Sequence, residues 1–292
     1  MIDFTTAQPL EEAIKSLGKR SPIGALLSSA EWERLPIEIR ERAFFSARVE
    51  SERFLADAQR RIMQRVRLER DAIEQGGRVM ERGRFIEEMQ DLLEEMGYVP
   101  DPDKVGTTQD LSSAGRLGLI WKMQLDQAHG HASWKAGMDP DILDAVPAQE
   151  LIRGMQREEE RDWPEIWEAN GGHFFGEPSA DYPAAEGRMI ALKTDPIWTA
   201  ISQFGTPWPP FRWGSGMVLR NVRRKEAVEL GLIRGDETFK PLTTPFNHGL
   251  KASIKGMPQA SLERLRSEFG ERVLIDEAEG IIEWLFGGKE AA

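Results

Sequence analysis

The sequence predicts an α+β protein that is predominantly helical, with long N-terminal helices followed by a small mixed α/β C-terminal domain. Apolar residues recur at helical spacing through the first third of the chain. Later, short apolar segments alternate with helical segments and with turns rich in proline and glycine. Seven of the nine tryptophans lie between Trp121 and Trp213, so we expect the best-packed core there.

The composition is typical of a folded chain. With 292 residues, of which 40% are hydrophobic and 8% aromatic, the chain can form two ordinary domains or one domain with an extension. The absence of cysteine excludes a disulfide scaffold and fits a reducing compartment. We predict a helical region over residues 1–110, a mixed domain over 111–235, and a small α/β appendage packed on that domain over 236–292.

One long helix is expected from Pro36 to about Glu74, a stretch without glycine or further proline. Its apolar positions are four or seven residues apart and form a single stripe: Ala43, Ala47, Phe54, Ala58, Ile62 and Val66. Glu50 interrupts this stripe. Two interpretations stay open for the helix: one arm of a helical bundle, or an arm that projects and docks on a partner oligomer.

Caps, prolines and glycines set the remaining elements. Helices are predicted over residues 81–96 and 112–136, the first ending at Gly97. Three internal glycines weaken the second helix: Gly115, Gly118 and Gly130. The elements expected after it are strands over 150–156, 189–192, 218–222 and 272–275, and helices over 163–172, 223–230, 259–269 and 277–286, with a further helix carrying Trp198.

The most unusual stretch runs from Gly205 to Met217 and reads Gly-Thr-Pro-Trp-Pro-Pro-Phe-Arg-Trp-Gly-Ser-Gly-Met. Its prolines fix φ, its aromatic residues prefer burial, and its later glycines permit positive φ. We therefore expect a rigid, buried turn with a candidate cis peptide at Trp208–Pro209, rather than a flexible linker or a polyproline ligand. The residues expected to maintain this domain are Trp198, Phe204, Trp208, Pro209, Pro210, Trp213 and Gly214.

This turn resembles that of the phage head-morphogenesis, or minor head protein, family of the Mu F-like group. The family's C-terminal domain has a helix, a strand and a polar cluster, and closes on a Pro-Pro-x-x-Trp-Gly-Cys-like turn followed by a strand and a helix. Residues 209–217 occupy that place here, and the resemblance covers about residues 20–235. Ser215 stands where relatives have a cysteine, so a metal-bound or disulfide-bonded turn is unsupported.

The resemblance implies a structural and assembly component of a tailed-phage or prophage head, not an enzyme. Such a protein would bind the portal protein and the capsid or scaffold proteins, would contact packaged double-stranded DNA only weakly, and would need no cofactor. We expect it in the host cytoplasm during assembly and then in the virion head, without membrane contact. The alternative is a hydrolase or toxin-like effector associated with a prophage, for which only the residues after Gly235 leave room.

No residue pattern favours catalysis or metal binding. His129 and His131 are two residues apart, so on a helix their side chains point about 200° away from each other and do not share a metal ion. The neighbours of Ser215 do not match the Gly-x-Ser-x-Gly nucleophile turn. The acidic run over residues 158–160 is more typical of a solvated loop than of paired catalytic carboxylates.

The formal net charge of −11 and the pI near 5.1 disfavour tight, non-specific binding of DNA. Two stretches are nevertheless locally basic, within residues 60–70 and 220–225. Both are typical of solvated helix faces with acids nearby. The first nevertheless supplies the candidate DNA contacts Arg60, Arg61, Arg65 and Arg67. A weak nucleic-acid-binding module, with affinity that falls steeply with salt, is therefore a third hypothesis.

Overall fold

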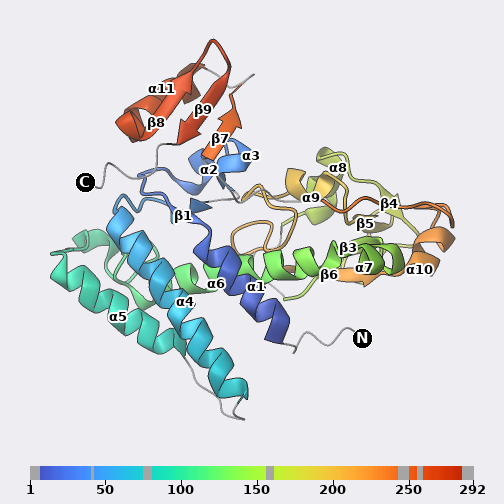
Figure 1. Cartoon of the computed structure of the whole chain (residues 1–292), viewed down its shortest axis with the longest axis horizontal. Helices are drawn as coiled ribbons and strands as arrows, with labels where there is room; N and C mark the ends of the chain where they lie inside the picture. The colour runs from blue at the N-terminus through green and yellow to red at the C-terminus, as the bar shows by residue number, and fades with distance from the viewer. Residues whose placement is uncertain are drawn as a thin grey trace. The chain divides into compact units, whose positions relative to one another are not determined.

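The computed structural model describes residues 7–40, 43–74, 81–155, 161–242, 250–254 and 259–284 (Figure 1). It has an α+β fold in which helix exceeds strand, as the sequence predicts. The chain forms two compact units. The helical unit combines Ile14–Leu125 with Pro245–Ala292, and the sheet unit combines Met1–Ala13 with Asp126–Thr244. Each unit therefore joins stretches that are far apart in sequence, unlike the three consecutive segments expected from composition.

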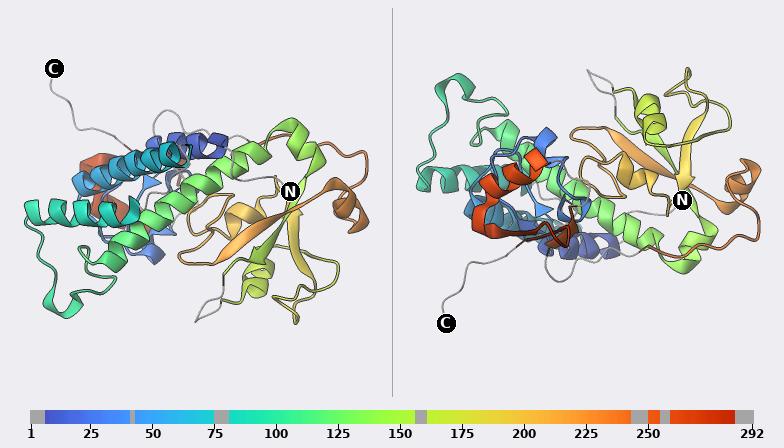
Figure 2. Two further views of the ribbon diagram at one scale, coloured as in Figure 1. Left: turned by 90° about the horizontal axis from the view of Figure 1, so that it is seen from below. Right: turned by 90° about the horizontal axis from the view of Figure 1, so that it is seen from above.

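The helical unit contains short elements followed by a long helical hairpin. The short elements are the parallel strands β1 (Ser21–Pro22) and β2 (Ala43–Phe44) and the helices α2 (Ser29–Trp32) and α3 (Ile37–Arg40). The preceding helix, α1 (Ala7–Gly18), is divided between the two units after Ala13. The hairpin consists of α4 (Glu52–Glu74) and α5 (Glu81–Glu95), which lie side by side (Figures 1 and 2). Gly97 follows α5 with φ of 72°, which confirms it as the left-handed residue that ends this helix.

The expected helix from Pro36 to Glu74 agrees with α3 and α4 but is wrong between them, over residues 43–51. After α3 the backbone leaves the helical path, because β2 pairs with β1 and Arg48 adopts a left-handed φ of 58°. Helix resumes at α4, where the Ser51 hydroxyl accepts a hydrogen bond from the Phe54 N–H at 3.1 Å and caps the first turn. Glu50, which interrupts the apolar stripe, lies in this gap.

A three-stranded antiparallel sheet completes the helical unit. Its strands lie in the order β7 (Leu250–Ser253), β9 (Ile281–Trp284) and β8 (Val273–Asp276). Along the chain, α11 (Gln259–Phe269) and a 3₁₀ turn, η2 (Gly270–Arg272), come between β7 and β8. The helix expected over 277–286 is wrong within the described residues. The Asp276 carboxylate accepts the N–H groups of Ala278 and Glu279 at 3.0 Å each, and Gly280 has φ of 70°, so the chain turns back as β9.

The C-terminal residues share a core with the start of the helical unit. One buried cluster contains Ile23, Trp32, Phe45, Ile254, Phe269 and Ile282 among its members. Trp32 and Phe45 stack with their ring centroids 3.7 Å apart. The residues after 245 therefore belong with the N-terminal segment of the chain, whereas composition suggested an appendage on the mixed domain.

The sheet unit is built on a four-stranded antiparallel sheet, whose strands differ in length and lie in the order β4-β5-β3-β6. These strands are β3 (Ala148–Arg153), β4 (Phe174–Phe175), β5 (Arg188–Leu192) and β6 (Met217–Val222). The helices are α7 (Pro140–Ala145), α8 (Trp163–Ala169), α9 (Ile197–Ala200) and α10 (Arg224–Glu229). α6 (Ala114–Gly137) contributes its first half to the helical unit and its second half to the sheet unit, and η1 (Pro102–Lys104) precedes it.

Candidate functional site

The two faces of the β3–β5–β6 sheet bury different side chains, because successive residues of a strand alternate between faces. One face packs against α8, α9 and the proline-rich turn, and its core contains Leu151, Trp163, Trp167, Trp198 and Phe211. The other face packs against α10 and contains Ala148, Ile190, Val222 and Ala227. The first face thus carries the aromatic core that the tryptophan distribution predicts.

The proline-rich turn docks on the second half of α6 through one glutamine. The Gln127 side chain donates a hydrogen bond to the Pro210 carbonyl at 2.8 Å and accepts one from the Trp208 indole N–H at 3.0 Å. The Trp208 indole is fully buried and packs edge-on against His131 and at a tilt against Trp134, with centroids 4.9 and 5.2 Å apart. Because its polar groups are satisfied internally, this side of the turn is a structural element.

A glycine makes this docking possible. A Cβ at Gly130 would lie 2.0 Å from the Pro209 carbonyl oxygen and 2.8 Å from Cδ1 of Trp208. The turn therefore packs directly against the helix backbone, at a distance that any side chain on residue 130 would prevent. This contact explains a glycine that costs helix propensity in the middle of a long helix.

The other turn residues differ in how deeply they are buried. Trp198 is fully buried and donates its indole N–H to the Leu192 carbonyl at 2.7 Å, and Phe204 is 9% exposed. Trp213 is only partly buried, and its ring centroid lies 4.9 Å from that of Phe204. It is therefore not the most deeply buried ring of the turn, although its size suggests that it would be. The fully buried ring at this end of the turn is Phe211.

The backbone of the turn contains two glycines with positive φ and one cis peptide bond. Gly214 and Gly216 have φ of 57° and 67°, which confirms that these positions use the freedom of glycine. The cis peptide lies at Pro209–Pro210, one residue later than the expected Trp208–Pro209. Ser215 is buried, and its hydroxyl accepts the Met217 N–H at 3.4 Å, so it supports the turn locally.

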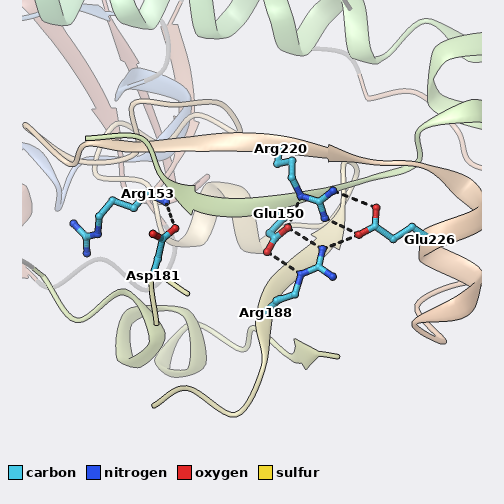
Figure 3. Close-up of polar contacts among 6 residues, drawn as sticks. All are labelled: Glu150, Arg153, Asp181, Arg188, Arg220 and Glu226. Atoms are coloured by element: carbon cyan, nitrogen blue, oxygen red, sulfur yellow. Dashed lines mark hydrogen bonds and ion pairs between the residues drawn. The ribbon is translucent and has the colours of Figure 1, made fainter. Parts of the chain in front are cut away.

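Four charged residues form a closed ionic cluster on the opposite face of the sheet (Figure 3). The Glu150 carboxylate of β3 accepts two hydrogen bonds from Arg188 of β5, both at 2.9 Å, and one from Arg220 of β6 at 2.6 Å. Both arginines also donate to Glu226 of α10 at 2.7 Å. The cluster therefore ties three strands to one helix with balanced charge.

The geometry of this ionic cluster (Glu150, Arg188, Arg220 and Glu226) sets its titration. The Arg220 hydrogen bond, helped by Arg188, lowers the pKa of the Glu226 carboxyl from 4.5 to about 2. Burial raises the pKa of Glu150, but the hydrogen bonds from the two arginines outweigh burial and leave it below its usual value. Both carboxylates are thus held ionised at neutral pH, and neither is suited to act as a general acid or base.

The candidate DNA contacts on α4 divide into two pairs. Arg61 binds Glu88 of α5 at 2.9 Å, and Arg65 binds Glu81 at 2.9 Å and also contacts Glu88. Burial lowers the pKa of the Arg65 guanidinium, but its two carboxylate partners outweigh burial and raise it. These two arginines hold the helical hairpin together.

Arg60 and Arg67 face solvent instead. The Arg60 side chain is 69% exposed and pairs with Asp57 one helical turn earlier, and Arg67 is exposed. The apolar stripe on the other side of α4 is buried within the helical unit at Ala58, Ile62 and Val66. Of the two interpretations of this helix, the packed arm of a helical bundle agrees with this burial.

Lys193 is a buried cation, and no local sequence pattern indicates its burial. Its side chain is 4% exposed and lies over the last turn of α6, with Nζ 3.3 Å from the position of a Cβ on Gly137. The ammonium makes no hydrogen bond or ion pair with any other residue that the structure describes. Burial lowers its pKa from 10.5 to about 8.

The other candidates for chemistry give no assembled site. His129 and His131 lie on α6, and burial lowers the pKa of His129. Residues 158–160 lie outside the described residues. Among the residues that the structure describes, no group of three or more histidine, aspartate or glutamate side chains is placed to hold a metal ion.

Sequence reasoning missed Gln127, Glu150 and Lys193. Glu150 carried a usable signal, because a lone acid followed by Leu-Ile in a short strand needs a buried basic partner. Gln127 and Lys193 carried none, since their roles depend on segments about eighty and fifty-five residues away in the chain.

Comparisons with known proteins found no protein-family model, no curated protein and no solved structure that matches this chain. In the described part of the chain, no helix is both long enough and apolar enough to cross a membrane.

Proposed function

We propose that this protein is a minor head, or head-morphogenesis, component of a tailed phage or prophage, acting as a structural and assembly factor without catalytic activity. It binds the portal protein and the inner capsid or scaffold, and it contacts packaged DNA weakly. Assembly takes place in the host cytoplasm, and the protein ends in the virion head.

The observation that carries this proposal is the turn over residues 205–217. The resemblance to the Mu F-like group lies in this turn, and in this chain the turn is followed by β6 and α10, a strand and then a helix, as the resemblance implies. The turn is docked on α6 by Gln127 and by the close approach at Gly130. A rigid turn of this kind supports a scaffolding role for the domain.

The ionic cluster supports a structural role for the sheet unit. Its four charged groups neutralise each other and fasten strands to a helix, so neither Glu150 nor Glu226 is free to transfer a proton. A hydrolase or toxin-like effector would need such a group near a nucleophile or a bound water.

The test is quantitative mass spectrometry of immature and mature heads purified from induced source cells. We expect a few copies of the chain per particle, present together with the portal protein, in at least the immature heads. A soluble cytoplasmic enzyme from the same cells serves as the control for contamination. Absence from both kinds of head, with the chain abundant in the lysate, would refute the proposal.

A further inference from the structure

The outward face of α4 carries a line of three arginines at seven-residue intervals: Arg53, Arg60 and Arg67. Seven residues are close to two helical turns, so these side chains point in nearly the same direction, and they are spaced by about 10.5 Å along the axis. They point roughly 140–180° away from Ile62, in the middle of the buried stripe. All three residues are exposed.

Among the described residues of α4, positive charge exceeds negative charge on this face. Between Arg53 and Arg67 the only acidic residue is Asp57, which pairs with Arg60. The two remaining arginines of the stretch, Arg61 and Arg65, are neutralised by carboxylates of α5. Asp71 lies one helical turn beyond Arg67 on the same face, so three outward arginines against two aspartates leave a net charge of +1, on a protein whose net charge is −11.

We infer that this arginine line (Arg53, Arg60 and Arg67) is a docking surface for the phosphate backbone of double-stranded DNA. The inference rests on the proposed function and deepens it, because it replaces two of the four candidate contacts, Arg61 and Arg65, with Arg53. The occupant follows from charge complementarity. Over the length of this line, about 21 Å, a duplex lying along it carries roughly twelve phosphate charges on its two strands, and those that face the helix meet the arginines.

The surface reads no sequence. Its guanidinium groups are spaced along one helix face and meet phosphates, which carry no base information. Each arginine can bind a phosphate with two parallel hydrogen bonds. Asp57 lowers the affinity of this surface for phosphate, because its carboxylate already pairs with the Arg60 guanidinium.

The test measures binding of a fluorescent DNA duplex of unrelated sequence by anisotropy, with the full chain, between about 50 and about 200 mM salt. We expect weak binding of the wild type that weakens with salt. The triple variant R53Q/R60Q/R67Q should lose more than about tenfold in affinity at the low-salt end, and its salt slope should fall by about three. Asp57→Asn should instead bind about two- to fivefold more tightly, because it releases Arg60.

The matched control is R223Q/K225Q/K240Q, which removes the same charge from exposed positions elsewhere and should bind like the wild type. Unchanged thermal unfolding of all variants shows that they remain folded. The inference is overturned if the wild type does not bind, if the control loses as much affinity as the arginine-line variant, or if single-stranded RNA binds more tightly than the duplex. None of these results bears on the presence of the chain in heads, so failure here and failure of the proposed function are distinguishable.

Discussion

Replacing Gly130 with alanine tests the docking of the proline-rich turn most directly. The added Cβ would lie 2.0 Å from the Pro209 carbonyl oxygen, a backbone atom that no side-chain rotation can move away. The nearest Trp208 ring carbon, at 2.8 Å, is also held, because its indole N–H is bonded to Gln127. The turn must therefore shift away from α6 as a whole.

Two opposing effects set the size of the change. Alanine in place of glycine favours an α-helix by about 1 kcal/mol. Overpacking of a well-packed contact costs roughly 1–3 kcal/mol, and loss of the two Gln127 hydrogen bonds adds about 1 kcal/mol each. We expect Gly130→Ala to lower the free energy of unfolding by roughly 2–4 kcal/mol.

The matched control lies in the same helix. A Cβ on Gly115 meets no atom within 4 Å, so Gly115→Ala should leave stability unchanged or raise it by up to about 1 kcal/mol. Urea unfolding followed by tryptophan fluorescence gives both values from the transition midpoint and slope. Equal stability of the two variants would refute the direct packing of the turn on the helix backbone.

Three further predictions follow from charged residues. The pKa of Lys193 is about 8 in the folded chain against 10.5 in the unfolded chain, so between these pH values only the unfolded chain keeps the proton. The free energy of unfolding should therefore rise by up to about 3 kcal/mol from pH 8 to 10.5. Urea titrations should show this rise in the wild type and not in Lys193→Met. The lowered pKa of Glu226, about 2 in the folded chain against 4.5 in the unfolded chain, stabilises the fold above pH 4.5, and this contribution is lost as the pH falls to 2. Circular dichroism during acid titration should therefore show a weaker pH dependence in Glu226→Gln over that range. Arg48→Gly should raise the midpoint of thermal unfolding by relieving about 1 kcal/mol of left-handed strain, whereas a lower midpoint would show that the Arg48 side chain contributes more than its backbone costs.

Local signals predicted many of the elements. The α5 helix follows from apolar spacing, and its end follows from one glycine, Gly97. The α11 helix matches its expected bounds, 259–269. The end of the helical path before α4 was indicated locally only by Glu50, which interrupts the apolar stripe. Its cause is the pairing of β2 with β1, a contact between segments about twenty residues apart.

Long-range packing decided the features that sequence reasoning missed. Gly118 and Gly130 read as defects in α6, yet each lies where another part of its unit approaches closely: the Arg82 side chain at one, the Pro209 carbonyl at the other. The ionic cluster needs the register of three strands, which places Arg220 opposite Glu150, and no local pattern encodes that pairing.

The division of the arginines on α4 follows the same reasoning. All four candidate DNA contacts look alike in sequence, because helical spacing alone does not show where α5 lies. Once the hairpin forms, Arg61 and Arg65 meet Glu88, while Arg60 and Arg67 remain outside. Burial and pairing, rather than residue type, separate structural cations from those available to a partner.

The shared core of the helical unit has a consequence for synthesis on the ribosome. Its cluster needs Ile23 and Phe45 from the start of the chain and Ile254 and Ile282 from the end. The aromatic core of the sheet unit lies wholly between residues 151 and 217, so all of its members have been made before Ile254 is added. During translation from the N-terminus, the apolar residues made first are therefore the last to find their partners.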